Sequence, residues 1–282
     1  MMNTTKTTKL FLAAAVMASL TGSVFAAGVN NTVDPAAVAM GAEAYGNSNT
    51  ITATGTSAFA VGYNNTVSKY NALVYGNSNT AAGTNSLAGG EYSKAKGRNS
   101  LAIGSSAQAL SDDTFAIGSQ ARANGTNTVA IGNGAYSENE SALAVGKGAK
   151  ARGVMSTAVG YGTRASNQYT TALGYQNEAT GVQSSAVGVN NEATGDYSAV
   201  IGTNSAANGN YSLASGFKAK AVADDSIAVG DQSKATGISS VAVGTIAEAT
   251  GGDAIAAGHS AIATGNLSTA ISSNAEAKVD NT

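Results

Sequence analysis

The sequence predicts an all-β protein, a parallel β-roll built from 14-residue coils that each contain two short strands. One observation is a strict repeat, because a glycine returns at every fourteenth position from Gly62 to Gly258 without insertion or deletion. A second is a phrase of the form Ser-x-Ala-Ile/Val-Gly that ends at this glycine, as in residues 100–104 and 226–230. A third is that side-chain size alternates with period two, which is typical of strands. A short period held over so many repeats indicates a solenoid.

We count the positions of each repeat from its glycine, position zero, and treat Ser272 as the last, substituted glycine. Position −2 is Ala in 14 of 16 repeats, and position +5 is Ala in another 14 of 16. The exceptions are Val74, Val200, Val67 and Ser137. A second glycine is frequent at +7. We therefore expect two arms of about five residues, each ending at a tight corner.

Alanine alone would favour helices over strands. Glycine argues the other way, because one at about every seventh position would cost a helix about 1 kcal/mol each time. A tight turn accepts glycine readily, since glycine adopts positive φ. The alternation and the glycine spacing therefore favour strands.

The alternation also predicts which side chains lie inside. Positions −4, −2 and zero carry Ser, Ala and Gly, and positions +3 and +5 are mostly small, so these faces should meet within a thin roll. Position +4 is often charged and should face water. Its charged residues include Arg122, Lys150, Arg164, Glu178, Glu192, Lys220, Lys234, Glu248 and Glu276.

Positions −3 and −1 form an aliphatic stripe on the outer face of the first arm. It contains Leu101, Ile103, Phe115, Ile117, Val129, Ile131, Leu143, Val145, Ile227, Val229, Val241 and Val243. A soluble monomer rarely exposes a contiguous apolar patch of more than a few hundred Å². Burial of each such side chain is worth roughly 1.5–3 kcal/mol. The sequence therefore predicts an obligate homo-oligomer in which identical stripes pack together.

The phrase Ser-x-Ala-Ile/Val-Gly-x-x-Ala-x-Ala-x-Gly resembles the head repeat of the YadA-like trimeric autotransporter adhesins, over roughly residues 28–279. This resemblance implies a left-handed parallel β-roll, a homotrimer, and attachment to host surfaces. The handedness and the number of chains come from the resemblance alone. With it, the repeats are interpreted as an adhesin head without catalysis or a cofactor.

Residues 1–26 are typical of a secretory signal peptide. Lys6 and Lys9 precede an apolar stretch at residues 10–20, and residues 24–26 provide a small-residue cleavage site. The apolar stretch is too short to span a bilayer. The alternative is an N-terminal anchor helix. We expect export, with Ala27 as the first mature residue.

Residues 27–61 contain repeats whose spacing differs from 14 residues. The interval from Gly46 to Gly62 is longer than the regular repeat, and Pro35 is the single proline of the chain. Terminal repeats of solenoids are usually irregular, and proline suits the end of a sheet. We expect an N-terminal cap over residues 27–61 and regular head repeats over 62–282.

Related adhesins continue into a neck, a coiled-coil stalk and membrane-anchoring strands. No apolar heptads and no alternating membrane strands precede Thr282. We therefore expect no stalk, membrane anchor or membrane insertion within this chain. The expected location is the cell surface, associated with the outer membrane, or the secreted fraction.

Composition excludes several other classes. The chain has no cysteine, so it relies on no disulfide. Its formal net charge of −2 offers no basis for binding nucleic acid. An ice-binding solenoid would need a Thr-x-Thr ladder that recurs with the period, and isolated triplets such as Thr52-Ala53-Thr54 do not form one.

No set of residues predicts an active site or a metal site. His259, the single histidine, lies at a corner without a second His or Cys to share a metal or proton. Gly132-Asn133-Gly134 and Gly146-Lys147-Gly148 match neither phosphate-loop spacing. Asp112-Asp113 and Asp224-Asp225 offer too few ligands for Ca²⁺. We expect hydrated corner residues at all of these places.

The predicted function is therefore adhesion to host extracellular matrix or epithelial surfaces through many equivalent weak contacts. The ligand-binding residues are unknown at this stage. The +4 charges are either a docking surface multiplied by repetition or a solvated face that prevents edge pairing. The main alternative is a structural component of the cell surface or biofilm matrix without a specific host ligand.

Overall fold

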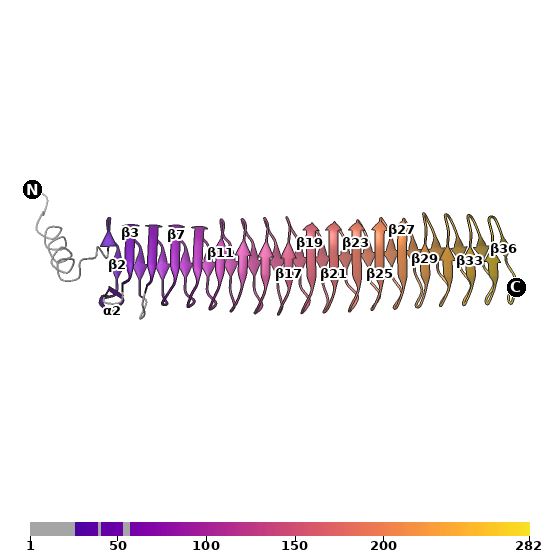
Figure 1. Ribbon diagram of the computed structural model, residues 1–282, viewed down its shortest axis with the longest axis horizontal. Helices are drawn as coiled ribbons and strands as arrows, with labels where there is room; N and C mark the ends of the chain where they lie inside the picture. Colours follow the sequence, from indigo (N-terminus) through magenta and orange to yellow (C-terminus); the bar gives the residue numbers. More distant parts are fainter. Residues whose placement is uncertain (1–25, 39–40, 53–56) are drawn as a thin grey trace, which may run out of the picture. The chain divides into compact units, whose positions relative to one another are not determined.

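The computed structural model describes residues 26–38, 41–52 and 57–282. The chain divides into two units between Asn127 and Thr128. Within its described residues, unit 1 contains seven coils, and unit 2 contains eleven. Each unit is a parallel β-solenoid in which every coil contributes one first-arm strand and one second-arm strand (Figure 1). The predicted all-β coil is confirmed.

The strands of unit 1 form two parallel ladders, one from each arm. Its first-arm strands are β1 (Ala26–Ala27), β3 (Glu43–Asn47), β5 (Phe59–Tyr63), β7 (Leu73–Asn77), β9 (Leu87–Glu91), β11 (Leu101–Ile103) and β13 (Phe115–Ile117). Its second-arm strands are β2 (Thr32–Val33), β4 (Thr50–Ile51), β6 (Thr66–Val67), β8 (Thr80–Ala81), β10 (Lys94–Ala95), β12 (Gln108–Ala109) and β14 (Arg122–Ala123). A single helical turn, α2 (Pro35–Val38), lies between β2 and β3.

Unit 2 repeats the same arrangement without a helix in its residues 128–282. Its first-arm strands are β15 (Val129–Ile131), β17 (Leu143–Val145), β19 (Thr157–Tyr161), β21 (Thr171–Tyr175), β23 (Ser185–Val189), β25 (Ala199–Thr203), β27 (Leu213–Phe217), β29 (Ile227–Val229), β31 (Val241–Val243), β33 (Ile255–Ala257) and β35 (Thr269–Ile271). Its second-arm strands are β16 (Tyr136–Ser137), β18 (Lys150–Ala151), β20 (Arg164–Ala165), β22 (Glu178–Ala179), β24 (Glu192–Ala193), β26 (Ala206–Ala207), β28 (Lys220–Ala221), β30 (Lys234–Ala235), β32 (Glu248–Ala249), β34 (Ile262–Ala263) and β36 (Glu276–Ala277).

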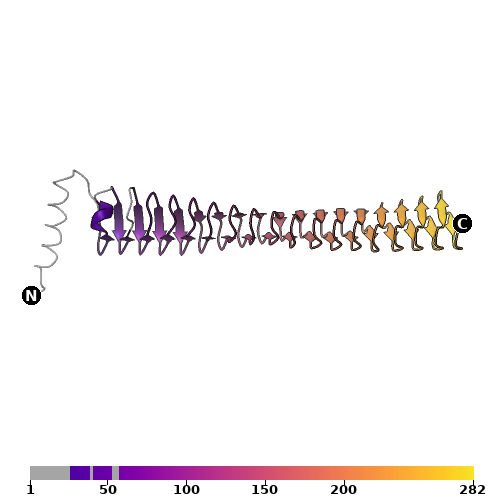
Figure 2. The same ribbon diagram turned by 90° about the horizontal axis from the view of Figure 1, so that it is seen from below.

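In both ladders, each residue pairs with the residue one repeat later in the sequence. Leu101 pairs with Phe115 on the first arm, and Lys234 pairs with Glu248 on the second. Equivalent positions of successive coils are therefore neighbours in the ladders, and Figure 2 shows the strands of successive coils side by side within each unit. The second-arm strands are shorter than the arms that the sequence suggested, because the flanking residues belong to the corners.

The first coils of unit 1 are longer than the rest. Ala26 pairs with Ala44, and Glu43 pairs with Phe59, so both steps exceed the regular period. The longest coil accommodates its additional residues in part as α2, which Pro35 begins at the position where a helix needs no N–H donor. Residues 1–25 of the predicted signal peptide lie outside those described, and Ala26 begins β1.

The core is a column of small side chains, as predicted. Alanines at −2 and +5, such as Ala102 and Ala109, are fully buried, and so are small residues at −4 and +3. The hydroxyl at −4 has a structural role that the sequence did not indicate. It donates to the carbonyl three residues earlier, as Ser184 does to Gly181 at 2.7 Å, and so closes the second corner.

Glycine recurs at position zero and, in many coils, at +7, for different reasons. At position zero, Gly188 has φ +123, and a Cβ there would overlap the carbonyl of Gly202 in the next coil. At +7, Gly181 has no positive φ, but its Cβ would overlap the carbonyl of Gly195. The prediction that corner glycines supply positive φ is therefore wrong at +7, where close backbone approach is the reason. The left-handed residues of each coil lie at +2 and +9 and are mostly not glycine, as in Asn190 and Tyr197.

Apart from the first coil, whose strand β1 has only two residues, the coils fall into two classes by the length of the first-arm strand. Long-strand coils have five-residue strands, namely β3, β5, β7 and β9 in unit 1 and β19, β21, β23, β25 and β27 in unit 2. Short-strand coils have three-residue strands, namely β11 and β13 in unit 1 and β15, β17, β29, β31, β33 and β35 in unit 2. Among the described residues, no helix is long and apolar enough to cross a membrane.

Candidate binding surfaces

The aliphatic stripe lies on the outer face of the first-arm ladder, where the alternation places it. In unit 2, Val159, Leu173, Val187 and Ile201 stack in register. Exposure is partial at most positions but reaches 55% at Ile201 and 67% at Ile271. The first-arm strands of unit 2 therefore carry a largely apolar surface, interrupted by a few Thr and Ser residues such as Ser215, that the described residues leave partly uncovered.

Aromatic side chains lie beside the stripe at position +1 of some long-strand coils. Tyr161 and Tyr175 stack with ring centroids 5.2 Å apart and planes 9° apart, and Phe217 lies farther along the same ladder. The alternation pattern did not indicate these contacts. The available signal was the pair of tyrosines at +1 in the consecutive repeats of Tyr161 and Tyr175.

A second aromatic pair lies at the second corner, at position +9. Tyr197 and Tyr211 stack 4.9 Å apart with planes only 3° apart, and both are about half exposed. Both residues are in the left-handed conformation, with φ near 58°. Backbone strain of this kind is unusual for a bulky residue, so the corner, rather than the side chain, determines where these rings lie.

The +4 side chains form a charged ladder that faces solvent, as predicted. Lys234 Nζ lies 2.7 Å from Glu248 Oε1, and Arg164 lies 3.4 Å from Glu178. Other positions put like charges together: Lys220 pairs in register with Lys234, and Glu178 with Glu192. Exposed ion pairs contribute at most about 1 kcal/mol, so this ladder does little for stability.

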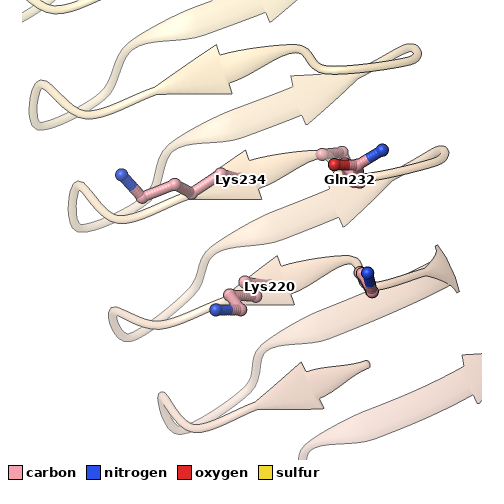
Figure 3. A pocket seen from close by; sticks show the side chains of 5 residues that line it. Lys220, Gln232 and Lys234 are labelled. Atoms are coloured by element: carbon pink, nitrogen blue, oxygen red, sulfur yellow. The ribbon is translucent and has the colours of Figure 1, made fainter. Parts of the chain in front are cut away.

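A shallow recess of about 220 Å³ opens between two coils of unit 2. It is lined by Lys218, Lys220, Gln232, Ser233 and Lys234. Figure 3 shows Lys220 and Lys234 reaching out from neighbouring strands, β28 and β30, in the same direction. Every lining side chain carries a hydrogen-bond donor and none is acidic, so the recess presents positive potential.

The histidine and the Gly-x-Gly segments, which could have belonged to a catalytic or phosphate-binding site, lie at corners. His259 is exposed at +1, and its carbonyl accepts the backbone N–H of Asn274 at 2.8 Å. Gly134 and Gly148 occupy the left-handed position +2 with open space around them, so their glycine serves backbone conformation. Lys147 lies 5.8 Å from the ring centroid of Tyr161, where it makes a cation–π contact.

The aspartate pairs hold corners together. Asp112 Oδ1 accepts the backbone N–H of Arg98 at 2.7 Å, and Asp113 Oδ1 accepts the amide of Asn99 at 2.8 Å. Asp224 Oδ1 accepts the backbone N–H of Asn210 at 2.8 Å in the same way. Within the described ranges, no three His, Cys, Asp or Glu side chains gather as metal ligands. Residues 53 and 54 of the Thr-x-Thr motif lie outside the described residues.

Comparison with known proteins agrees with the repeat geometry. A search of curated proteins found no match. The family model described as "YadA head domain repeat (2 copies)" matches repeatedly, at residues 53–79, 95–121, 111–135, 123–149, 137–163, 151–177, 179–205, 193–219, 207–233, 221–247 and 249–271. These matches together cover well over half of the chain. The chain therefore belongs to the family of YadA head domain repeats.

Proposed function

We propose that this chain is the head of a homotrimeric, non-catalytic surface adhesin that binds host extracellular matrix or epithelial surfaces. The family implies adhesin-type function and exposure at the cell surface. The observation that carries the proposal is the arrangement of surface positions in register, because the corners and the solvent-facing +4 position recur with every coil. A polymer lying along a unit would therefore meet many nearly equivalent contacts.

The aliphatic stripe supports assembly. Apolar side chains such as Ile201, Val243 and Ile271 are each more than one-third exposed on one face of unit 2. A contiguous apolar face of this kind is typical of an interface. Identical faces on three chains can cover one another around an axis, and the family implies that number and a left-handed roll. We propose that the stripe is the trimer interface.

Multivalency supplies the affinity in this proposal. Linked sites can exceed the affinity of a single site by about 10²–10⁴ without any new kind of contact. Weak contacts at exposed corners therefore suffice when three chains each present many of them. No single corner substitution should abolish adhesion, whereas dissociation of the trimer should.

Export and domain limits complete the proposal. Residues 1–26 direct secretion, residues 27–61 cap the first unit, and residues 62–282 form the head repeats. The mature head is presented at the cell surface, associated with the outer membrane, or released.

Light scattering and surface plasmon resonance test this function together. The intact protein should be trimeric and should bind immobilised matrix proteins or epithelial cells. Val229→Asp should dissociate or unfold the particle, because it buries an unpaired charge in the stripe, and should abolish binding. Glu248→Ser, on the solvent-facing ladder, is the matched control and should do neither.

Three results would contradict the proposal. A well-folded monomer would refute assembly through the stripe. Equal binding by trimer and monomer, or one corner substitution that eliminates binding, would show a discrete pocket instead of avidity. Trimerisation without binding to any matrix or cell surface would favour a structural component of the cell surface or biofilm matrix.

A further inference from the structure

We propose that the basic recess formed by Lys218, Lys220, Gln232 and Lys234 binds the sulfate groups of a disaccharide unit within an acidic polysaccharide. The proposal deepens the adhesive function proposed above and rests on it only for the biological role of the site. The binding chemistry follows from the recess itself.

The recess gathers three lysines, of which only Lys234 is neutralised by an ion pair among the described residues. Lys220 and Lys234 pair in register on β28 and β30, about 4.8 Å apart along the ladder. Like charges directly opposite each other destabilise a sheet. Lys234 has a carboxylate partner in Glu248, 2.7 Å away. Among the described residues, neither Lys220 nor Lys218 has an ion-pair partner, so both ammonium groups are available to an anion.

The remaining lining adds directional donors and excludes acids. Gln232 occupies the left-handed position +2, one coil beyond Lys218, and both side chains are exposed. Ser233 is buried, and its hydroxyl donates to Gly230 at 3.1 Å, so it closes the floor of the recess. Lys218 Nζ lies 4.9 Å from the ring centroid of Phe217, a contact that holds the ammonium at the rim.

The neighbouring coils limit the length of the basic surface. Along the +4 ladder, Glu192 and the uncharged Ala206 precede Lys220, and Glu248 follows Lys234. The positive segment is therefore only two coils long. Asp231 lies beside Gln232 at +1 and is also outside the recess lining.

This short segment favours a ligand whose negative charges cluster on a small unit. A sulfated disaccharide carries several anionic groups within about two coil spacings of about 4.8 Å. Duplex nucleic acid spreads one charge over about every 1.7 Å of its axis, so it would also meet Glu192 and Glu248. With a formal net charge of −2, the chain offers no general attraction that could replace the local site.

Titration of the intact protein with heparin tests the proposal by calorimetry at several salt concentrations. Heparin should bind, and chemically desulfated heparin, which keeps its carboxylates, should bind at least about tenfold more weakly. The double variant Lys218→Gln/Lys220→Gln should weaken heparin binding by about tenfold and should reduce the slope of log K against log salt by about two. Asp231→Asn should strengthen binding, because it removes a neighbouring negative charge.

Lys150→Gln is the matched control, since Lys150 occupies the same position +4 in unit 2, is exposed, and lies outside the recess. It should leave heparin binding unchanged. Equal losses in the control and the double variant would overturn the site. Absence of heparin binding, equal binding of desulfated heparin, or tighter binding of duplex DNA would overturn the ligand class.

The same variants separate this proposal from the adhesive function. If the double variant loses heparin binding but still attaches to immobilised matrix proteins, the adhesive function stands on other contacts. If heparin binds the recess but the intact protein attaches to no surface, the site stands and the adhesive function fails.

Discussion

Long-strand and short-strand coils have the same period and the same column of alanines, but they close the first corner in different ways. In the short-strand coils, the backbone N–H at +3 donates to the carbonyl of its own repeat glycine, as Ala247 does to Gly244 at 3.3 Å. In most long-strand coils, this N–H donates instead to a side chain of the preceding coil, as Asn191 does to Asn177 Oδ1 at 2.9 Å. The first corner is therefore closed either within a coil or between coils.

Buried asparagines at +3 produce the second arrangement. Asn191 donates its side-chain amide to the carbonyls of Val187 and Gly202 at 2.9 and 2.7 Å, and its Oδ1 accepts the N–H of Ser205 at 3.0 Å. Asn49, Asn65 and Asn79 form the equivalent ladder in unit 1. Each asparagine side chain forms hydrogen bonds with backbone groups at the corner. The turn bond within the coil is then not formed, and the first-arm strand is longer.

Two exceptions show that the preceding coil can determine the corner. Ala219 belongs to a long-strand coil although it has no polar side chain, because its N–H donates to Ser205 Oγ at 3.0 Å. Ser233 belongs to a short-strand coil although it is polar, and its N–H donates to its own Gly230 at 3.5 Å. Ala219, the residue before Ser233 in the ladder, offers no side-chain acceptor. At these two corners, a side-chain acceptor in the preceding coil therefore decides the closure, whereas β19 is a long strand although the preceding coil offers no such acceptor.

The largest loss of stability is expected from substitutions that remove a feature that the two classes share, the glycine at position zero. Gly188→Ala in a long-strand coil and Gly244→Ala in a short-strand coil should each destabilise the protein by about 2–4 kcal/mol, because both have positive φ and both would overlap the next carbonyl. Thermal unfolding measures the loss. Gly148→Ala, with open space around it at φ +67, should cost only about 1 kcal/mol. Similar losses for all three would refute close approach as the cause.

The asparagine ladder should be the next most sensitive feature. Asn191→Ala removes three hydrogen bonds from a buried site and should cost about 2–3 kcal/mol in denaturant unfolding. Hydrogen exchange at the Ser205 amide should accelerate, since that group loses its acceptor. Asn208→Ala, which removes one exposed bond to Thr194, should change stability by less than about 0.5 kcal/mol. A loss at Asn191 no larger than at Asn208 would mean that the ladder does not stabilise the corner.

Core volume should also distinguish the two classes. The larger apolar core residues Ile51, Val67, Val74 and Val200 all lie in long-strand coils. Ala186→Val in a long-strand coil should therefore cost less than about 1 kcal/mol, whereas Ala242→Val in a short-strand coil should cost about 1–3 kcal/mol by overpacking. Denaturant midpoints measure both. Equal costs would show that strand length does not affect the room inside the roll.

The smallest expected effect concerns Tyr45 in the first long-strand coil. A hydrogen bond from its hydroxyl to Glu43, 2.9 Å long, raises the pKa of Tyr45 above the ordinary value of 10.0, with desolvation and the Glu43 charge adding to the effect. Because the folded pKa is raised, this contribution to stability is present below the unfolded pKa and is lost as pH rises through the folded pKa. Ultraviolet titration should show a late-ionising tyrosine that Glu43→Gln shifts earlier and Tyr45→Phe removes. A titration that Glu43→Gln leaves unchanged would contradict the assignment.

The sequence by itself determined the coil, its register and the two sides of each arm. Glycine at every fourteenth position and alanine at −2 and +5 leave a single way to stack the chain without voids, so the repeat pattern alone places Ala102 and Ala109 inside. The +4 charges could be placed in water for the same reason. The exposure of the aliphatic stripe followed from the same alternation.

Three features depended on the tertiary structure alone. They are the way each first corner closes, the close backbone approach that favours glycine at +7, and the gathering of lysines around the basic recess. Whether Ala219 or Ser233 extends its strand depends on an acceptor that lies one repeat earlier in the chain and in the adjacent coil in space. The overlap that forbids a Cβ at Gly181 is with a carbonyl of another coil. Lys218, Lys220 and Lys234 surround one recess only because stacking places successive coils about 4.8 Å apart. A sequence pattern reports the preferences of one repeat, whereas these features depend on how neighbouring repeats meet.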